Sequence, residues 1–290
     1  MGVVRRPGGR PGGGMAAHMG RITSRHKVVR IDLDHGVSSR VETVAVEEPL
    51  EIRVDDEVLT VTMRTPGHDI ELAHGLLQAE GIITGADDVL AARYCADTTV
   101  LNVLQLQLRS RSGVPATAQR SLVSHGGCGL CGKTSIDAIA RSPAYDAIAL
   151  SADGPLVPAG RIAELPDLLR HGQPIFERTG GVHAAGLFGP TGDAVVIRED
   201  IGRHNSVDKI TGWALLHAYP TGQSIAMVSS RASFEIVQKV AMAGIPVLAC
   251  ISAPSSLAIE AAERLGVTLI AYARGRRLTV CSHPGRVAFP

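Results

Sequence analysis

The chain has 290 residues, of which 45% are hydrophobic and 20% charged, values that are ordinary for a globular protein. It contains no apolar run of membrane-spanning length, and the N-terminal arginines are not followed by the apolar segment of a secretory signal. Aromatic residues make up only 3%, which leaves little material for stacking nucleic-acid bases. We therefore expect neither a membrane protein nor a nucleic-acid-binding protein.

The net charge of +1 is unevenly distributed along the chain. Residues 1–30 carry seven Lys and Arg residues and no Asp or Glu, so the remainder is mildly acidic. Residues 1–24 are rich in Gly, Arg and Pro, and they predict a disordered basic tail. The five cysteines are an odd number without the spacing of a disulfide framework. That count favours a reducing compartment, so we expect a cytoplasmic protein.

Residues 25–118 predict a smaller, β-rich N-terminal domain with one helix. Apolar residues recur at helical spacing over 70–81, where Gly81 ends the expected helix. Two of the expected strands flank Asp55-Asp56-Glu57 and predict a β-hairpin. The expected strands lie at 28–31, 51–54, 58–63 and 100–108.

Residues 119–290 predict an α/β domain that begins with a loop holding two cysteines. Toward the C-terminus, strands and helices alternate with short loops between them, which indicates a mostly parallel sheet with right-handed crossovers. A helix over 161–170 is expected to be interrupted by Pro166. The expected strands lie at 194–197, 225–228, 246–251, 267–272 and 278–281, with helices at 233–243 and 255–265.

Three loops follow the predicted parallel strands. Ligands on such sheets bind beyond the carboxyl ends of the strands. The loops offer hydroxyl groups, cations and helix N-terminal N–H groups, which suit a phosphate. The same serines could instead be helix caps and the arginines solvated, but the agreement of all three loops favours an anion site. The loops are 229–231, 252–256 and 274–277.

The densest polar run of the chain lies at 198–209, between two apolar elements. Within it, Asn205 is expected to cap the following helix, with Asp208 at the third helical position. His183 and His204 are candidates for proton transfer or phosphate contact. Either could equally be a hydrogen-bonded structural histidine.

Two cysteines, Cys128 and Cys131, lie in a loop rich in glycine. A CxxC pair has three interpretations: half of a zinc site, a thioredoxin-like redox pair, or thiolates that accept and pass on sulfur as a persulfide. No second CxxC or HxxxH completes a zinc site, and no long hydrophobic strand runs into the motif as a thioredoxin-like pair would require. Nearby His125 and Lys133 could lower a thiol pKa. The glycine-framed loop favours reactive sulfur on an arm that reaches a partner.

An ordered set of segments resembles the formate dehydrogenase accessory sulfurtransferase family, FdhD. The resemblance runs from about residue 28 to the C-terminus, in the order of the family. Each segment alone is a weak signal, but the ordered set is specific. The matching segments are Thr65-Pro66-Gly67 with the helix from Glu71 to Gly81, Cys128-Gly129-Leu130-Cys131-Gly132-Lys133, Thr179-Gly180-Gly181-Val182-His183-Ala184-Ala185, Arg198 to Lys209, Ala243-Gly244-Ile245-Pro246-Val247-Leu248, Ser252-Ala253-Pro254 and Arg274-Gly275-Arg276.

The resemblance implies a sulfurtransferase that works through a cysteine persulfide. Such a protein takes sulfur from a cysteine desulfurase and delivers it to the molybdenum cofactor, bis(molybdopterin guanine dinucleotide), before that cofactor enters the catalytic subunit of formate dehydrogenase. The cofactor, or a guanine nucleotide, is then a substrate, and no permanently bound cofactor and no metal are expected. The resemblance also implies a cytidine-deaminase-like fold for the C-terminal domain and a homodimer.

Carried over to this sequence, the resemblance makes Cys128 and Cys131 the sulfur-relay thiols, with Cys128 as the persulfide carrier. The cofactor-contacting segment corresponds to Tyr272, Ala273, Arg274, Gly275, Arg276 and Arg277, and it begins with tyrosine where the family pattern has phenylalanine. Deaminase chemistry is not expected, because the H-x-E and P-C-x-x-C zinc motifs are absent from the sequence. Two alternatives stay open: a non-catalytic molybdenum cofactor chaperone and a thiol–disulfide oxidoreductase.

Overall fold

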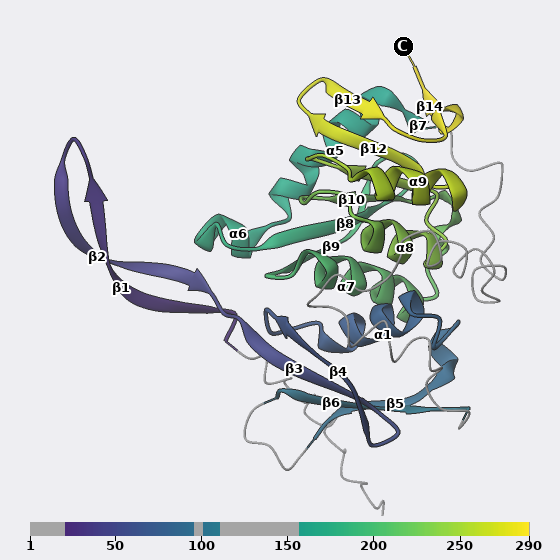
Figure 1. Ribbon diagram of the computed structural model, residues 1–290, viewed down its shortest axis with the longest axis horizontal. Helices are drawn as coiled ribbons and strands as arrows, with labels where there is room; N and C mark the ends of the chain where they lie inside the picture. The colour runs from purple at the N-terminus through teal and green to yellow at the C-terminus, as the bar shows by residue number, and fades with distance from the viewer. Residues whose placement is uncertain (1–20, 96–100, 111–156, 290) are drawn as a thin grey trace, which may run out of the picture.

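The computed structural model describes residues 21–95, 101–110 and 157–289 (Figure 1). The cysteine-containing loop, with Cys128 and Cys131, lies outside these residues, as do most of the predicted basic tail and the expected domain boundary at 118/119. Strand β1 (Thr23–Asp32) begins within the predicted tail and pairs antiparallel with β2 (Gly36–Ala45). The two strands form a hairpin that projects from the body, and we call it the arm (Figure 1).

A four-stranded sheet and one helix form the N-terminal part of the body. The strand order is β4-β3-β6-β5, with β3 and β6 parallel. Alternate residues of β3 are buried against helix α1 because strand side chains point to opposite faces in turn. The predicted hairpin and helix are confirmed. The elements are β3 (Glu48–Val54), β4 (Glu57–Arg64), α1 (Asp69–Ala79), β5 (Val89–Tyr94) and β6 (Val103–Leu108), with a 3₁₀ turn η1 (Ala86–Asp88).

A six-stranded sheet of order β13-β12-β11-β10-β8-β9 forms the centre of the larger part. Only β10, β11 and β12 are neighbours that run parallel. The prediction of a mostly parallel sheet is therefore wrong at both edges, where β8, β9 and β13 pair antiparallel. The bounds are β8 (His183–Phe188), β9 (Ala194–Asp200), β10 (Ile225–Val228), β11 (Val247–Cys250), β12 (Thr268–Arg274) and β13 (Arg277–Val280).

Short turns explain the antiparallel edges. Gly189 N donates to Asp193 O in the turn between β8 and β9, and only Gly275 and Arg276 separate β12 from β13. A connection of this length can only reverse the chain into a hairpin, whereas parallel neighbours need a crossover. The cytidine-deaminase-like character of this part stays a prediction.

Helices cover both faces of the six-stranded sheet and make a layered body. On one face, an apolar core joins the sheet to α7 (Arg203–Leu216), α8 (Phe234–Met242) and α9 (Ser256–Arg264). On the other face, α5 (Ala159–His171) buries Ile162, Leu165 and Leu169 and continues through Pro166, so the predicted interruption is wrong. The remaining elements are α6 (Pro174–Thr179), the paired β7 (Val157–Pro158) and β14 (Val287–Ala288), and the 3₁₀ turns η2 (Thr221–Gln223) and η3 (Pro284–Arg286). None of the helices in the described part is long and apolar enough to cross a membrane.

Helix α1 packs against α7 and joins the two parts of the body (Figure 1). Two glycines make the contact unusually close. A Cβ added at Gly75 would lie 2.0 Å from Asp208 O, and one added at Gly212 would lie 1.8 Å from Glu71 O. Because both obstacles are backbone atoms, neither can rotate away. The close approach of α1 and α7 therefore requires glycine at both positions.

This packing predicts that Gly212→Ala destabilises the protein by about 3 kcal/mol, at the upper end of the usual cost of overpacking. Urea unfolding followed by circular dichroism measures the change. Gly222→Ala is the matched control, since a Cβ at Gly222 meets no atom within 4 Å. Equal stability of the two variants would contradict the packing argument.

Candidate functional site

The carboxyl ends of β10, β11 and β12 lie at one edge of the sheet because these strands are parallel. The loops after β10 and β11 are tied together. Ala232 N donates to Ala253 O at 3.2 Å, and Ser255 N donates to Ala232 O at 3.0 Å. The structure thus brings the first two predicted anion loops side by side, and we call this edge the carboxyl edge.

The serine hydroxyls of the carboxyl edge mostly serve the fold. Ser229 Oγ accepts from Ala184 N at 2.9 Å, and Ser255 Oγ caps α9 by accepting from Ala258 N at 3.1 Å. Ser230 Oγ donates to the carbonyl of Arg231 at 3.0 Å. The interpretation of these serines as structural groups fits the geometry. Any anion at this edge would depend on cationic groups.

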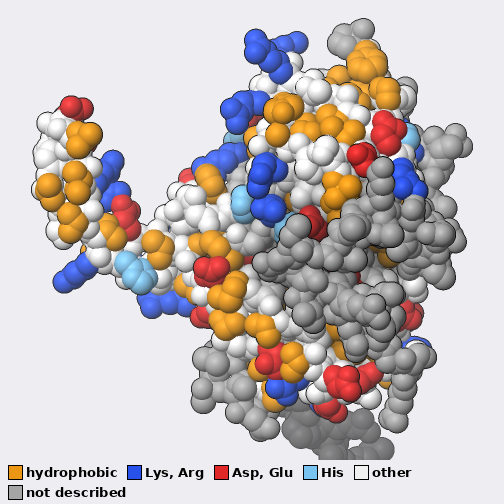
Figure 2. Space-filling view, viewed as in Figure 1, with side chains coloured by type: hydrophobic (Ala, Val, Ile, Leu, Met, Phe, Trp, Pro, Cys, Tyr) orange, Lys and Arg blue, Asp and Glu red, His pale blue; other side chains and the backbone are white. Residues whose placement is uncertain are grey.

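Cations come from the β12–β13 hairpin, which carries the predicted cofactor-contacting segment. Arg274, Arg276 and Arg277 are exposed at its turn, and Figure 2 shows Lys and Arg side chains gathered along the upper left of the body. Gly275 has φ +56, a left-handed conformation that favours glycine. Ala273 is buried in the core, so only its main chain faces the edge. The three arginines share one hairpin turn, and their contact with a cofactor stays a prediction.

Tyr272 occupies an irregular position in the same segment. Its φ is +52, and the pairing register of β12 with β13 shifts between Ala271 and Arg274. Its backbone N donates to Ser252 O at 3.2 Å, and the residue is 52% exposed. A non-glycine residue in this conformation is strained. The irregularity leaves the tyrosine ring exposed beside the loop that follows β11.

A second group of ionisable side chains lies where β8 and α7 begin. His183 is the first residue of β8 and pairs with Asp200, while Arg203 and His204 start α7. His204 Nε2 lies 3.3 Å from Ser233 Oγ and 3.9 Å from Glu235 Oε2 of α8. His183 and His204, proposed separately from the sequence, therefore lie near one end of α7.

Burial has the largest effect on the pKa values of this group, and the charge of Arg203 contributes to them. Burial lowers the pKa of His183, and the positive charge of Arg203 lowers it further, so the ring is neutral at pH 7. For Glu235, burial raises the pKa, but the Ser233 hydroxyl and the nearby His204 and Arg203 outweigh it and lower the pKa overall. Arg203 Nε is buried and has no hydrogen-bond partner among the described residues. That donor is suited to an oxygen of an anionic ligand.

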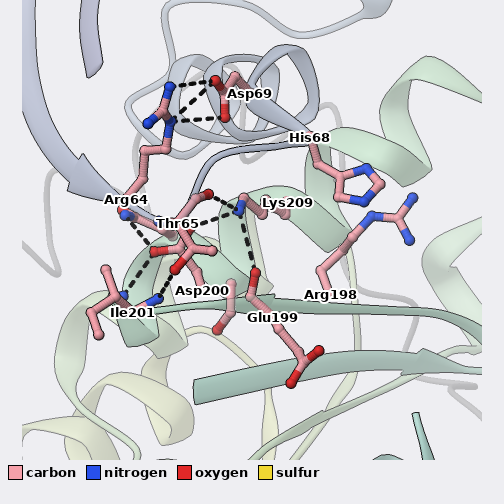
Figure 3. Close-up of polar contacts among 12 residues, drawn as sticks. Arg64, Thr65, His68, Asp69, Arg198, Glu199, Asp200, Ile201 and Lys209 are labelled. Carbon is pink, nitrogen blue, oxygen red and sulfur yellow. Dashed lines mark hydrogen bonds and ion pairs between the residues drawn. The ribbon is translucent and has the colours of Figure 1, made fainter. Parts of the chain in front are cut away.

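The start of α7 is held by the buried carboxylate of Asp200 (Figure 3). Lys209 Nζ donates to Asp200 Oδ2 at 2.6 Å, and Thr65 N donates to the same oxygen at 3.2 Å. Gly202 N and Asn205 Nδ2 donate to Oδ1 at 2.8 and 3.0 Å. Four donors thus satisfy one carboxylate that is fully buried. Because Gly202 and Asn205 lie on either side of Arg203 in the sequence, these hydrogen bonds fix the position of Arg203.

The predicted capping role of Asn205 is wrong. Helix α7 begins three residues earlier than predicted, with Gly202 as its N-cap, and Asn205 instead donates to Met63 O at 2.7 Å. The polar run 198–209 was a correct signal of an unusual region. It did not reveal that three of its members form buried ion pairs, Lys209 with Asp200 and Asp208 with Lys239.

Two further ion pairs connect α1 to neighbouring strands. Arg64 Nη2 of β4 lies 3.0 Å from Asp69 Oδ2, and both side chains are buried (Figure 3). Arg198 of β9 donates from Nε and Nη2 to Glu71, at 2.6 and 2.8 Å. Burial opposes ionisation of Glu71, but Arg198 and the adjacent His68 outweigh it and lower its pKa from 4.5 to about 2. Glu71 therefore stabilises the contact between α1 and β9 only when it is ionised.

The Glu71 contact predicts a loss of stability in acid. Since the folded pKa is lower than the unfolded one, the stabilisation is complete above about pH 4.5 and is lost as the pH falls toward 2. We expect Glu71→Gln to lower stability at pH 7 and to reduce the difference from the wild type at pH 3. Thermal melts from pH 7 to 3 measure this trend. A difference that stays constant with pH would contradict it.

Two cysteines of the described part of the chain, Cys250 and Cys281, differ from reactive thiols. Burial raises the pKa of Cys250 to about 11, and burial also raises the pKa of Cys281. Both thiols are therefore protonated at neutral pH, and a protonated thiol is a poor nucleophile. Within the described ranges, no group of three or more His, Cys, Asp and Glu side chains is placed to hold a metal ion. The sulfur-relay role of Cys128 and Cys131 stays a prediction.

Comparison with known proteins gives consistent results. A family model described as the FdhD/NarQ family matches residues 45–288. Relatives named "Sulfur carrier protein FdhD" include one from Nocardia farcinica, 49% identical over 92% of this chain and 96% of that protein. Another, from Streptomyces coelicolor, is 46% identical over 93% of this chain and 97% of that protein. A crystal structure from Desulfotalea psychrophila, described as a formate dehydrogenase accessory protein, superimposes with a TM-score of 0.71 and 26% identity, covering 92% of this chain and 100% of that one.

Proposed function

The chain belongs to the FdhD/NarQ family, and from that premise we propose that it is a sulfur carrier protein in the maturation of formate dehydrogenase. The identity of 49% with a sulfur carrier protein over almost the whole of both chains carries this proposal. The CxxC pair of the sequence supplies the thiol chemistry that such a role needs.

In the proposed reaction, Cys128 receives sulfur from the persulfide of a cysteine desulfurase. The Cys128 thiolate attacks the outer sulfur of that persulfide and forms a new S–S bond. The donor S–S bond breaks, and the donor cysteine leaves as a thiolate. No external oxidant or reductant is consumed, because one persulfide replaces another.

Release of the sulfur requires two electrons, which the second thiol can supply. The Cys131 thiolate attacks the inner sulfur of the Cys128 persulfide, and the outer sulfur leaves as sulfide. The product is a Cys128–Cys131 disulfide, which a cellular dithiol reduces before the next cycle. This scheme gives the two cysteines distinct roles: Cys128 carries the sulfur and Cys131 releases it.

The carboxyl edge supports bis(molybdopterin guanine dinucleotide) as the recipient. Each guanine dinucleotide contains a pyrophosphate, and Arg203, Arg274, Arg276 and Arg277 supply cations for it. The exposed Tyr272 ring can stack on a base. Gly275 and the main chain of Ala273 shape the turn between the arginines. The loaded cofactor then passes to the catalytic subunit of formate dehydrogenase.

The persulfide is tested by intact-mass measurement. The purified protein, incubated with a cysteine desulfurase and free cysteine, should gain the mass of one sulfur atom, and a reductant should reverse the gain. Cys128→Ala should gain no sulfur. Cys131→Ala should load but keep its sulfur, because the thiol that releases sulfide is missing.

A Cys131→Ala variant that gains no sulfur, or a Cys128→Ala variant that loads normally, would contradict the carrier mechanism. In the first case, with guanine-nucleotide binding retained, the protein would act as a cofactor chaperone. A Cys128–Cys131 disulfide that turns over with dithiol substrates, without any persulfide, would identify an oxidoreductase instead.

Cofactor recognition is tested with guanosine diphosphate, which contains the base and the pyrophosphate. We expect Arg203→Ala to weaken binding by about 10- to 100-fold, the effect of losing one charge-assisted hydrogen bond. Isothermal titration calorimetry measures the affinity. Arg93→Ala is the control. It removes the same charge, but from an exposed side chain on β5 of the four-stranded sheet. Equal affinities of the two variants would exclude Arg203 from the site.

A further inference from the structure

An acidic side chain, Glu235, lies among the ionisable groups at the carboxyl edge. It belongs to the first turn of α8, the helix that follows the loop after β10. Helices α7 and α8 lie side by side on one face of the six-stranded sheet, so the start of α7 brings Arg203 and His204 near it (Figure 1). His204 Nε2 lies 3.9 Å from Glu235 Oε2 and 3.3 Å from Ser233 Oγ. A carboxylate thus stands at the place where an anionic ligand would find its cations.

The fold leaves much of this carboxylate in contact with solvent. The Glu235 side chain is 53% exposed, whereas the acidic side chains of α7 and of the end of β9 are buried and paired with lysines. Burial raises the pKa of Glu235, but the Ser233 hydroxyl, its own backbone N–H, His204 and Arg203 outweigh it, so the group is ionised at neutral pH. An ionised carboxylate accepts hydrogen bonds and repels phosphate. A ligand group that lies against Glu235 therefore has to present N–H donors.

The cofactor of the proposed function presents such donors on two of its rings. Guanine and the pterin of molybdopterin both contain a 2-amino-4-oxopyrimidine ring, whose edge carries an amino N–H, a ring N–H and a carbonyl oxygen in that order. Glu235 supplies two acceptor oxygens for the two N–H groups. His204, in the tautomer with hydrogen on Nε2, supplies a donor beside them for the carbonyl oxygen. The pair is complementary to the whole edge.

The position of Glu235 on the sheet also suits a dinucleotide. Strand β11 alone separates β10 from β12, so the ends of β10 and β12 are two strand spacings, about 10 Å, apart. An extended guanine dinucleotide is longer than this distance. One of its rings can therefore lie at Glu235 while its pyrophosphate lies toward the arginines of the β12–β13 hairpin.

We propose that Glu235 is a specificity-determining residue that binds the 2-amino-4-oxopyrimidine edge of guanine or of pterin. This inference rests on the proposed function, because it takes the molybdenum cofactor as the ligand. Adenine has a ring nitrogen lone pair where guanine has a ring N–H, and a carboxylate repels that lone pair. The arginines alone cannot make this distinction, since all nucleoside diphosphates carry the same phosphates. Glu235 adds the repulsive contact that excludes the wrong ring.

Two matched pairs of ligands test the assignment. Inosine diphosphate is guanosine diphosphate without the 2-amino group, and lumazine has a carbonyl where pterin has that group. Isothermal titration calorimetry of the full-length wild type should show, in at least one pair, that the amino compound binds about 10- to 100-fold more tightly, the effect of one hydrogen bond to a charged group. A preference in the nucleotide pair assigns guanine to Glu235, and a preference in the pteridine pair assigns pterin.

Glu235→Gln should abolish this preference, because a carboxamide has one acceptor oxygen and replaces the other by a donor. The variant should instead favour the ligand with a carbonyl in place of the amino group: xanthosine diphosphate over guanosine diphosphate, or lumazine over pterin. A residue that only supports the fold would not reverse the preference. Glu260→Gln is the control, since it removes the same charge from an exposed position of α9 and should keep the wild-type preference. Circular dichroism confirms that both variants are folded.

Equal affinities within both pairs for the wild type, a wild type that binds none of these ligands, or a preference that survives Glu235→Gln would each overturn the inference. Sulfur loading of the wild type is measured separately by intact mass. A wild type that loads sulfur without any ligand preference would therefore overturn this inference alone. One that shows the preference without loading sulfur would instead contradict the carrier mechanism.

Discussion

The buried carboxylate of Asp200 is the interaction on which the arrangement of the body depends. A charge inside a protein is stable only when donors replace the water that it has lost. Here those donors come from three places: Thr65 at the end of β4, Gly202 and Asn205 at the start of α7, and Lys209 one turn later. One side chain at the end of β9 therefore fixes the four-stranded sheet, α7 and the six-stranded sheet relative to one another.

That constraint has a chemical consequence at the carboxyl edge. Since Asp200 takes Lys209 as its ion partner, the next cation along the chain, Arg203, is not consumed by the network and keeps a buried donor without a partner in the described part of the chain. The neutral His183 beside it adds no competing positive charge. The same interaction that organises the fold thus holds Arg203 in place, so that in the proposed function little reorganisation is needed for it to bind an anionic ligand.

Local patterns in the sequence predicted most of the elements but not their long-range partners. The hairpin of β3 and β4, helix α1 and the alternating strands from Ile225 onward follow from periodicity and turn residues. The antiparallel edge of β8 and β9 was missed because the alternation of strands and helices begins only after these strands, and the edge at β13 was missed because the two-residue turn after β12 was interpreted only as an anion-binding loop. Thr65 and Asp200 are 135 residues apart, and no local spacing indicates such a contact. Asn205 was misassigned because its side chain has the chemistry of a cap but is used for a distant carbonyl.

The thiols of the described residues bear on how a sulfur carrier avoids loading the wrong cysteine. Cys250 is the last residue of β11 and lies at the carboxyl edge itself, where its Sγ contacts Ser252 O at 3.1 Å. Burial keeps its pKa near 11, so at neutral pH it is almost wholly the thiol and cannot compete for a persulfide sulfur. A reactive thiolate at this position would accept sulfur before the cofactor did. In the proposed mechanism, the apolar core around Cys250 therefore has a chemical as well as a packing role, because it keeps this thiol out of the sulfur exchange proposed for Cys128 and Cys131.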